Sequence, residues 1–376
     1  MDIRLHFQKT PRKPFNGMRI AIKDIFDVKG VKTSGQSRSY NQLYGPATSS
    51  APPIQRLLDL GAIVVGKVKC TQFASSEQPT ADWIETLCPW HPRGDGFLNP
   101  RGSSTGSGVA VAGYSWLLDT VGFITRNAEL FHDINTQLYP IPTNISTIRL
   151  MYLEDYLPYD NPDAQEIMDR FVTHMSEFLG LSVERINLAR LWDDHDPTGK
   201  GISLKDHVTP IMNTLIWAGY DRNYARFRQE YRKTFNADAY VNPVIRFAWE
   251  RGATITEETI KEVEDARAIY KKWMEDVVFQ QKDGPFGAIA MYPVGDPEPV
   301  YRDNYRLSPE KLTGYNWRDK EDHQACLAEL PAIVVPDTDH CLTKLVQDML
   351  KSTGLPLSVQ AGKTPFEVAE IPSQKL

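Results

Sequence analysis

The chain has 376 residues, of which 41% are hydrophobic and 24% are charged, and its formal net charge is −6. This length and composition allow one large buried core or two modest ones. A mildly acidic chain gains little from neutralising phosphates, so we expect no nucleic acid among its main partners. No apolar run reaches transmembrane length and the first residues lack an apolar signal core, so we expect no membrane partner and a cytoplasmic location.

The metal-binding residue types are scattered along the chain. Its four cysteines form no CxxC pair, and its eight histidines show neither HExxH nor HxH spacing. Structural zinc sites need such close pairs of ligands, and disulfide frameworks are typical of short secreted domains. We therefore expect no metal site and no cofactor.

The first third of the chain alternates between short strand and helix patterns. Residues 18–22 form an apolar run, residues 54–60 have helical spacing, and residues 62–65 read as a buried strand that Gly66 closes. Such alternation predicts an α/β domain whose strands are buried on both faces.

The middle of the chain is more helical. Asn161 followed by Pro162 predicts the start of a helix, and Gly180 predicts its end. The residues expected on its apolar face are Ile167, Phe171, Met175 and Phe178.

Two capping-box spacings predict two more helices. Ser203 with Asp206 marks the first start, and Thr254 with Glu257 marks the second. The second helix carries apolar residues at helical intervals, which we interpret as core residues: Ile260, Val263, Ala266, Ile269 and Trp273. Further along, strands are expected at 288–292 and 332–335, each followed by proline.

The segment 17–30 places Lys23 at the end of the first predicted strand. Low-dielectric surroundings disfavour the charged form of a lysine and so suit it to proton transfer. The alternatives are a solvated lysine at a strand end, or ion pairs with Asp24 and Asp27.

The segment 99–113 is the clear glycine- and serine-rich stretch of the chain. Its glycines and hydroxyls would present backbone N–H groups and short donors to an anionic centre, just before small residues that let a helix start close to a sheet. It has neither the lysine of a Walker loop nor the third glycine of a dinucleotide fingerprint.

In this order, the two segments resemble the amidase signature family, whose members cleave amide C–N bonds with a serine–serine–lysine triad. The resemblance is closest to fungal members. It implies an α/β amidase-signature fold, with a central mixed β-sheet flanked by helices on both faces. It also covers 61–67, 119–126, 288–293 and 330–336.

By position, Lys23 looks like the family's catalytic lysine, a general base that acts through a bridging serine. Ser103 looks like that bridging serine, whose backbone is cis in relatives. The resemblance also implies a substrate-binding role for the rest of the loop, in which Thr105 replaces a common glycine: Gly102, Ser104, Thr105 and Gly106.

The family's nucleophilic serine is not found at the expected place. In relatives, an Asp-Thr-Gly-Gly-Ser-type motif supplies this serine and the oxyanion-hole N–H groups. Here either the motif has decayed, with Val121 and Phe123 in place of its glycine and serine, or a block is missing at the junction of Leu118 and Asp119. The missing block is our preferred interpretation, because residues 119–126 resemble a later family segment.

The resemblance implies a hydrolase of the C–N bond in a small organic amide, in fungal secondary metabolism, with activity lost or weakened. The alternatives are a non-catalytic pseudo-amidase that binds or scaffolds, and a hydrolysis that uses Thr125 or Ser115. We expect a single truncated domain over residues 1–376, with 1–16 as an N-terminal extension and 294–322 as a surface excursion. The expected ligand is a small-molecule amide, and a homodimer is left open.

Overall fold

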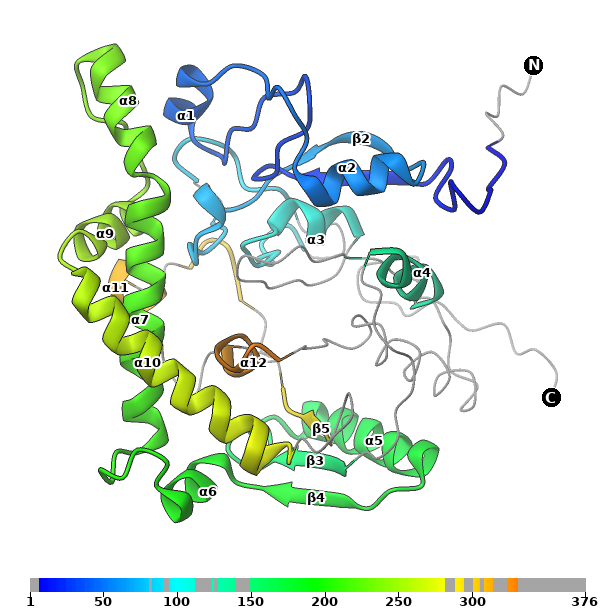
Figure 1. The fold of residues 1–376 in the computed structure, drawn as a ribbon. Coiled ribbons are helices and arrows are strands. Elements are labelled where there is room, and N and C mark those ends of the chain that lie inside the picture. The colour runs from blue at the N-terminus through cyan, green and yellow to red at the C-terminus, as the bar shows by residue number, and fades with distance from the viewer. Residues whose placement is uncertain are drawn as a thin grey trace.

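The computed structural model describes residues 7–80, 83–90, 95–111, 124, 128–138, 149–280, 288–293, 300–304, 308–313 and 323–330. Within these residues, helices alternate with short parallel strands, which confirms the predicted α/β class (Figure 1). The junction of Leu118 and Asp119, the hydroxyls of Ser115 and Thr125, and the predicted strand 332–335 lie outside the described residues.

A two-stranded parallel sheet carries the predicted lysine. Strand β1 (Arg19–Lys23) pairs with β2 (Ile63–Val68), and helix α2 (Pro52–Asp59) lies between them in sequence. Ile54 of α2 packs with Ile22 of β1 in one buried cluster. These positions confirm the predicted first strand and first helix.

The second strand is longer and more exposed than the sequence predicts. Gly66 does not close β2, because after a register shift next to Ile20 it pairs with Ala21 and the ladder continues to Val68. Val65 is 61% exposed, so β2 is not buried on both faces.

A three-stranded parallel sheet lies apart from the first one (Figure 1). Its central strand β3 (Arg149–Leu153) pairs with β4 (Val183–Ile186) and β5 (Ala288–Met291). Four successive residues of β3 are buried, as expected for a strand covered on both faces. The described strands thus form two parallel sheets where the sequence analysis expected a single mixed one, and β5 confirms the strand predicted near residues 288–292.

Helix α5 (Pro162–Leu179) covers the three-stranded sheet and begins and ends as predicted. The Asn161 side chain accepts hydrogen bonds from the first-turn N–H groups, and Gly180 ends the helix with a φ of 65°. Of the predicted apolar face, Met175 is buried but Ile167 is 60% exposed. The packed face is rotated toward Met168 and Val172, which join Phe171 and Phe178 against the sheet.

The largest core joins this sheet to three helices, α6 (Leu188–His195), α7 (Leu204–Asn223) and α10 (Glu257–Trp273). Ser203 caps α7 as predicted, and Trp273 is a core residue, 3% exposed. The predicted start of α10 is wrong by two residues. Thr256 accepts the capping hydrogen bond, whereas the Thr254 hydroxyl donates to the Arg251 carbonyl at the end of the preceding helix.

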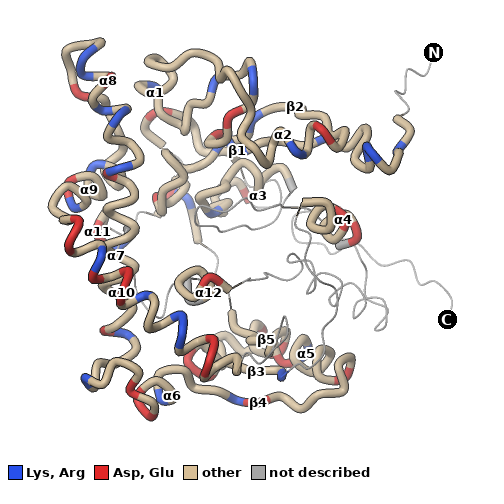
Figure 2. The backbone as a smooth tube through the Cα atoms, viewed as in Figure 1, with Lys and Arg blue, Asp and Glu red and all other residues tan. Residues whose placement is uncertain are grey.

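An aromatic core joins the N-terminal part to the helical part. Phe73, Phe227 and Trp249 are buried there together, each ring centroid within 6.4 Å of the next. The elements involved are α1 (Arg38–Leu43), the short 3-10 helix η1 (Gln72–Ala74), α8 (Ala225–Phe235) and α9 (Pro243–Gly252). Acidic and basic residues are interspersed along the outer helices α8, α9 and α10 (Figure 2).

Among the described residues of the predicted surface excursion, 300–304 and 308–313, one is buried. Arg302 is 4% exposed and donates to the carbonyls of Cys88 and Pro89. Within the described parts of the chain, none of the helices has both the length and the apolarity to cross a membrane. The remaining elements are α3 (Thr105–Val111), α4 (Ala128–Leu138), the π-helical turn η2 (Met274–Val278), α11 (Pro309–Thr313) and α12 (His323–Ala328).

Candidate active site

The structure brings together the two residues that the sequence predicts as catalytic. Lys23 is the last residue of β1, and Ser103 lies in the loop that leads into α3. The Lys23 Nζ donates a hydrogen bond of 2.8 Å to the Ser103 Oγ, across 80 positions of sequence. Ser103 is 6% exposed, so the contact lies in a region largely shielded from water.

Two backbone hydrogen bonds fix the loop of Ser103 against the residues that follow β2. The Thr71 N–H donates to the Ser103 carbonyl at 3.0 Å, and the Gly106 N–H donates to the Lys69 carbonyl at 2.6 Å. The Gly102–Ser103 peptide bond is cis, as the family resemblance implied for the bridging serine. The loop is therefore held at Ser103 itself and again three residues later, at Gly106.

Two loop positions are too crowded for any side chain. A Cβ on Gly102 would lie 2.8 Å from the Thr71 Cγ2, and a Cβ on Gly106 would lie 2.5 Å from the Lys69 backbone nitrogen. Close packing of the loop on the end of β2 thus accounts for both glycines. Their predicted contact with substrate stays a prediction.

The other two predicted substrate contacts differ in exposure. Thr105 begins α3 and is 1% exposed, and its Oγ1 has no hydrogen-bond partner in the part of the chain that is described. An unsatisfied buried hydroxyl costs about 1–3 kcal/mol, so Thr105 is a destabilising residue at this position unless its hydroxyl is bound. Ser104 is partly buried, and its carbonyl accepts from the Gly108 N–H at 2.9 Å.

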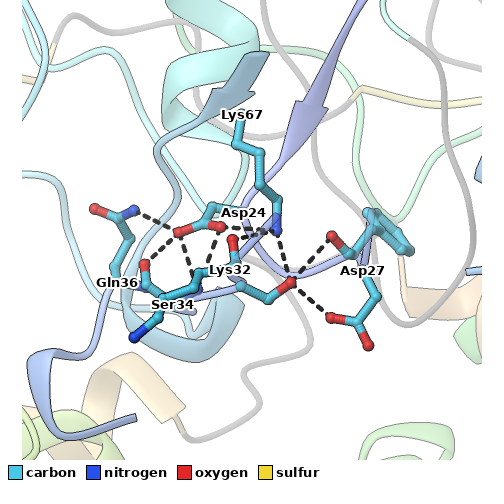
Figure 3. A network of polar contacts seen from close by, with 8 residues as sticks. Asp24, Asp27, Lys32, Ser34, Gln36 and Lys67 are labelled. Atoms are coloured by element: carbon cyan, nitrogen blue, oxygen red, sulfur yellow. Dashed lines mark hydrogen bonds and ion pairs between the residues drawn. The ribbon is translucent and has the colours of Figure 1, made fainter. Parts of the chain in front are cut away.

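A buried acid–base network adjoins the pair, and the sequence analysis did not predict it. The Asp24 carboxylate forms an ion pair of 2.9 Å with the Lys67 Nζ, and each side chain is only 11% exposed. The same carboxylate accepts from the Ser34 hydroxyl and backbone N–H and from the Gln36 side-chain amide (Figure 3).

Lys67 extends this network to Thr33 and, through it, to Asp27. Its Nζ donates 2.7 Å to the Thr33 Oγ1, which in turn donates 2.6 Å to Asp27 (Figure 3). The two aspartates proposed as alternative partners of Lys23 are therefore engaged elsewhere, Asp24 by Lys67 and Asp27 by Thr33. Since Asp24 is the next residue after Lys23, the network also anchors the backbone that carries the lysine.

Cys70 lies close enough to Lys23 for their charges to interact. Burial raises the pKa of the Cys70 thiol to about 12, and the Lys23 ammonium opposes this rise only in part. A thiol with so high a pKa is protonated at neutral pH and is a poor nucleophile. Among the described residues, no serine or threonine hydroxyl forms a hydrogen bond with the Ser103 Oγ.

The missed residues carry a signal that could have been used. Lys67 follows Gly66 near the carboxyl end of β2, and the carboxyl ends of parallel strands lie at the same edge of a sheet. The sequence could therefore have placed Lys67 at the sheet edge where Asp24 follows β1, although not in contact with it. Ser34 and Gln36 belong to a turn without a periodic pattern, and their contacts with Asp24 depend on the folded path of that turn.

The fold and this pair together define an α/β protein with a lysine–serine site. Residues 2–127 match the family model described as Amidase. A glutamyl-tRNA(Gln) amidotransferase subunit of Lachnoclostridium phytofermentans is 28% identical over 279 residues, which are 72% of this chain and 51% of that protein. Its counterpart in Chloroflexus aurantiacus is 41% identical over 219 residues, 56% of this chain and 41% of that protein.

Solved structures show the same fold. The chain matches 6-aminohexanoate cyclic dimer hydrolase with a TM-score of 0.60 and 13% identity, over 90% of this chain and 85% of that one. It matches an amidase crystal structure with a TM-score of 0.56 and 16% identity, over 92% and 86% of the two chains. Over residues 2–127 the chain resembles the amidase signature family, and it shares the fold of these two solved structures. It spans about half the length, or less, of the curated relatives described above.

Proposed function

We propose that this chain is an amidase-family hydrolase that acts on the C–N bond of a small organic amide. The observation that carries this proposal is the buried hydrogen bond of 2.8 Å between the Lys23 Nζ and the Ser103 Oγ. A neutral lysine in this position takes the Ser103 proton, and Ser103 takes a proton from the attacking group. The match of residues 2–127 to the Amidase family model supports the same reaction class.

The reaction adds water across the amide. The C–N bond breaks, a C–O bond forms, and the proton held at Lys23 passes to the departing nitrogen, so that the products are a carboxylic acid and an amine. The described pair provides the proton path for this step. We propose that the activity is weak or lost, because the sequence lacks the serine of the family's Asp-Thr-Gly-Gly-Ser-type motif.

The alternative is a pseudo-amidase that binds an amide without cleaving it. The same sequence feature favours it, since a triad without its nucleophile keeps only binding and residual catalysis. We extend the proposal to fungal secondary metabolism on the resemblance of the sequence to fungal members. The cytoplasmic location and the homodimer stay predictions from the sequence.

Amine release from a panel of aryl and alkyl amides tests the proposal. The panel includes glutamine, because the relatives are named as glutamyl-tRNA(Gln) amidotransferases. We expect slow turnover that falls roughly 10²–10⁴-fold in Lys23→Ala, the usual contribution of a general base. Lys29→Ala is the matched control, because Lys29 is exposed and its only described hydrogen bond is made by its backbone N–H.

Three outcomes separate the hypotheses. Turnover that Lys23→Ala abolishes and Lys29→Ala retains supports the hydrolase. Thermal stabilisation by an amide without turnover supports the pseudo-amidase. Turnover unchanged in Lys23→Ala, or neither turnover nor stabilisation with any amide, would overturn the proposed function.

A further inference from the structure

A small cavity lies beside the glycine- and serine-rich loop that carries Ser103. Its volume is about 10 Å³, close to the space that one water molecule needs. The side chains of Gln72, Glu77, Glu85 and Asn242 are among those that line it. The Glu77 carbonyl lies 3.5 Å from where a Cβ on Gly102 would be, so the cavity adjoins the loop that carries Ser103.

Two carboxylates face this cavity, and no lysine or arginine is among the residues that line it. Glu77 accepts two hydrogen bonds from the Asn242 Nδ2, at 2.9 and 3.0 Å. Glu85 accepts one of 2.5 Å from the Gln72 Nε2, and the Arg38 backbone N–H is shared between its two carboxylate oxygens at 3.3 Å; the Arg38 guanidinium offsets part of its charge from outside the cavity. Burial raises the pKa of both glutamates, and their hydrogen bonds with Asn242, Gln72 and Arg38 oppose this rise only in part.

The nitrogen donors that line the cavity are all in use. The Gln72 Nε2 donates to Glu85, the Asn242 Nδ2 donates to Glu77, and the Trp83 Nε1 donates to the Gln78 carbonyl.

The remaining two lining side chains are occupied in the same way. The Gln36 Nε2 donates to Asp24, and the Thr86 hydroxyl donates 3.0 Å to the Gln36 Oε1. The lining thus combines two carboxylates with neutral donors and no cationic side chain, which favours an occupant that donates hydrogen bonds or carries positive charge.

One of these acceptors has no partner at all. Asn242 is 4% exposed, and its Oδ1 forms no hydrogen bond with any described residue. Donation by the Nδ2 to Glu77 fixes which end of the amide is oxygen, so this unpaired atom is not an amide that should be flipped. A buried acceptor without a donor is destabilising unless something binds to it.

We propose that the cavity binds one small dehydrated monovalent metal cation, of the size of Na⁺, held by the Asn242 Oδ1 and the carboxylates of Glu77 and Glu85. The volume excludes a hydrated ion or an organic cation. Within the described residues, no group of three or more His, Cys, Asp or Glu side chains is placed to hold a metal, and Ca²⁺ takes six to eight oxygens. Two carboxylates, one of them partly neutralised, therefore favour a single positive charge. This site does not depend on amide hydrolysis.

Thermal unfolding of the full chain at constant ionic strength tests the site. We compare NaCl, KCl and choline chloride, because choline is too large for the cavity. We expect Na⁺ to raise Tm saturably by about 2–4 °C over choline when its concentration is well above Kd, and K⁺ to do so less.

Two variants and one control link the effect to the cavity. Glu77→Gln removes one charge without changing shape, and Asn242→Leu removes the unpaired oxygen, so both should lose the Na⁺-specific rise in Tm. Glu264→Gln, on the exposed face of α10, should keep it. A Na⁺ effect that survives in both cavity variants would overturn the proposal.

The wild-type protein alone also decides the question, should the variants fail to fold. We expect the wild-type protein to increase the ²³Na NMR relaxation rate of a NaCl solution, and an excess of Li⁺ to reverse this increase. Equal Tm values in NaCl and choline chloride with no excess relaxation would mean that a water molecule fills the cavity, and the proposal would be wrong.

Discussion

Asp24→Asn is expected to destabilise the protein through the buried ion pair with Lys67. The substitution keeps the shape of the side chain and removes its charge. Asparagine then leaves the Lys67 ammonium, 11% exposed, without its carboxylate. The Thr33 hydroxyl and the Lys32 carbonyl still accept from the ammonium, so part of its hydrogen bonding survives.

The distance sets the magnitude. Two unit charges 2.9 Å apart attract by about 6 kcal/mol at an effective dielectric constant of about 20. The hydrogen bonds that survive at Lys67 offset some of this loss. We therefore expect the free energy of unfolding to fall by about 3–5 kcal/mol, the range for removing one partner of a buried pair.

Urea unfolding followed by tryptophan fluorescence and circular dichroism measures this loss, provided that the m-value is unchanged. Asp193→Asn is the control, because Asp193 is exposed and should change stability by less than about 0.5 kcal/mol. The double variant Asp24→Asn/Lys67→Met should lose less than the sum of its single variants, because it leaves no charge unpaired. A loss in Asp24→Asn as small as the control's, or strict additivity, would refute the reasoning.

Three further predictions concern glycines and a glutamate. Gly106→Ala would place a Cβ 2.5 Å from the Lys69 nitrogen, so it should lower the free energy of unfolding in urea by at least about 1–3 kcal/mol. The control Gly66→Ala has nothing within 4 Å of its Cβ and should be neutral or stabilising. Equal effects of the two substitutions would contradict the packing argument. Gly180→Ala should lower the free energy of unfolding by about 1–2 kcal/mol because of its φ of 65° alone. No loss would mean that the backbone at the C-terminal end of α5 adopts another conformation without cost. Burial raises the pKa of Glu77 above its ordinary 4.5, so the folded state keeps that proton to higher pH than the unfolded state does. In choline chloride, the stability of the wild type relative to Glu77→Gln should therefore be greatest below pH 4.5 and fall as pH rises through the folded pKa, and a flat difference would exclude the burial of this charge.

Local signals predicted the ends of helices where one residue alone could supply the cap. Helix α5 begins after Asn161 and ends at Gly180, as expected. Few neighbouring residues could replace the side-chain acceptor of Asn161 or the left-handed backbone of Gly180. Thr254 failed as the cap of α10 because Thr256 offers the same hydroxyl, and Thr254 is already used to end α9. Two equivalent caps so close together cannot be ranked from sequence.

The faces of elements were less predictable than their existence. Ile167 has the right spacing for the buried face of α5, yet it is exposed because the sheet meets the helix along Met168 and Val172. The rotation of a helix about its axis depends on the partner it packs against, which its own periodicity fixes only to within a residue or so.

In the candidate site, too, the sequence identified some residues but not the contacts of others. Family resemblance identified Lys23 and Ser103, and they lie within hydrogen-bond distance. The ion pair of Asp24 with Lys67 was not predicted, because it depends on the register of β1 against β2, including the shift next to Ile20. A one-residue slip would turn Lys67 to the other face of the sheet.

The two backbone hydrogen bonds that tie Thr71 to Ser103 and Lys69 to Gly106 have a consequence for how this region tolerates change. They bring both ends of the intervening chain to one place, so the segment from 72 to 102 starts and ends at the same point of the scaffold. Lengthening a loop whose ends are already joined adds little entropic cost. An insertion beside Leu87 and Trp90, which are 74% and 65% exposed, should therefore be accepted without moving Lys23 from Ser103.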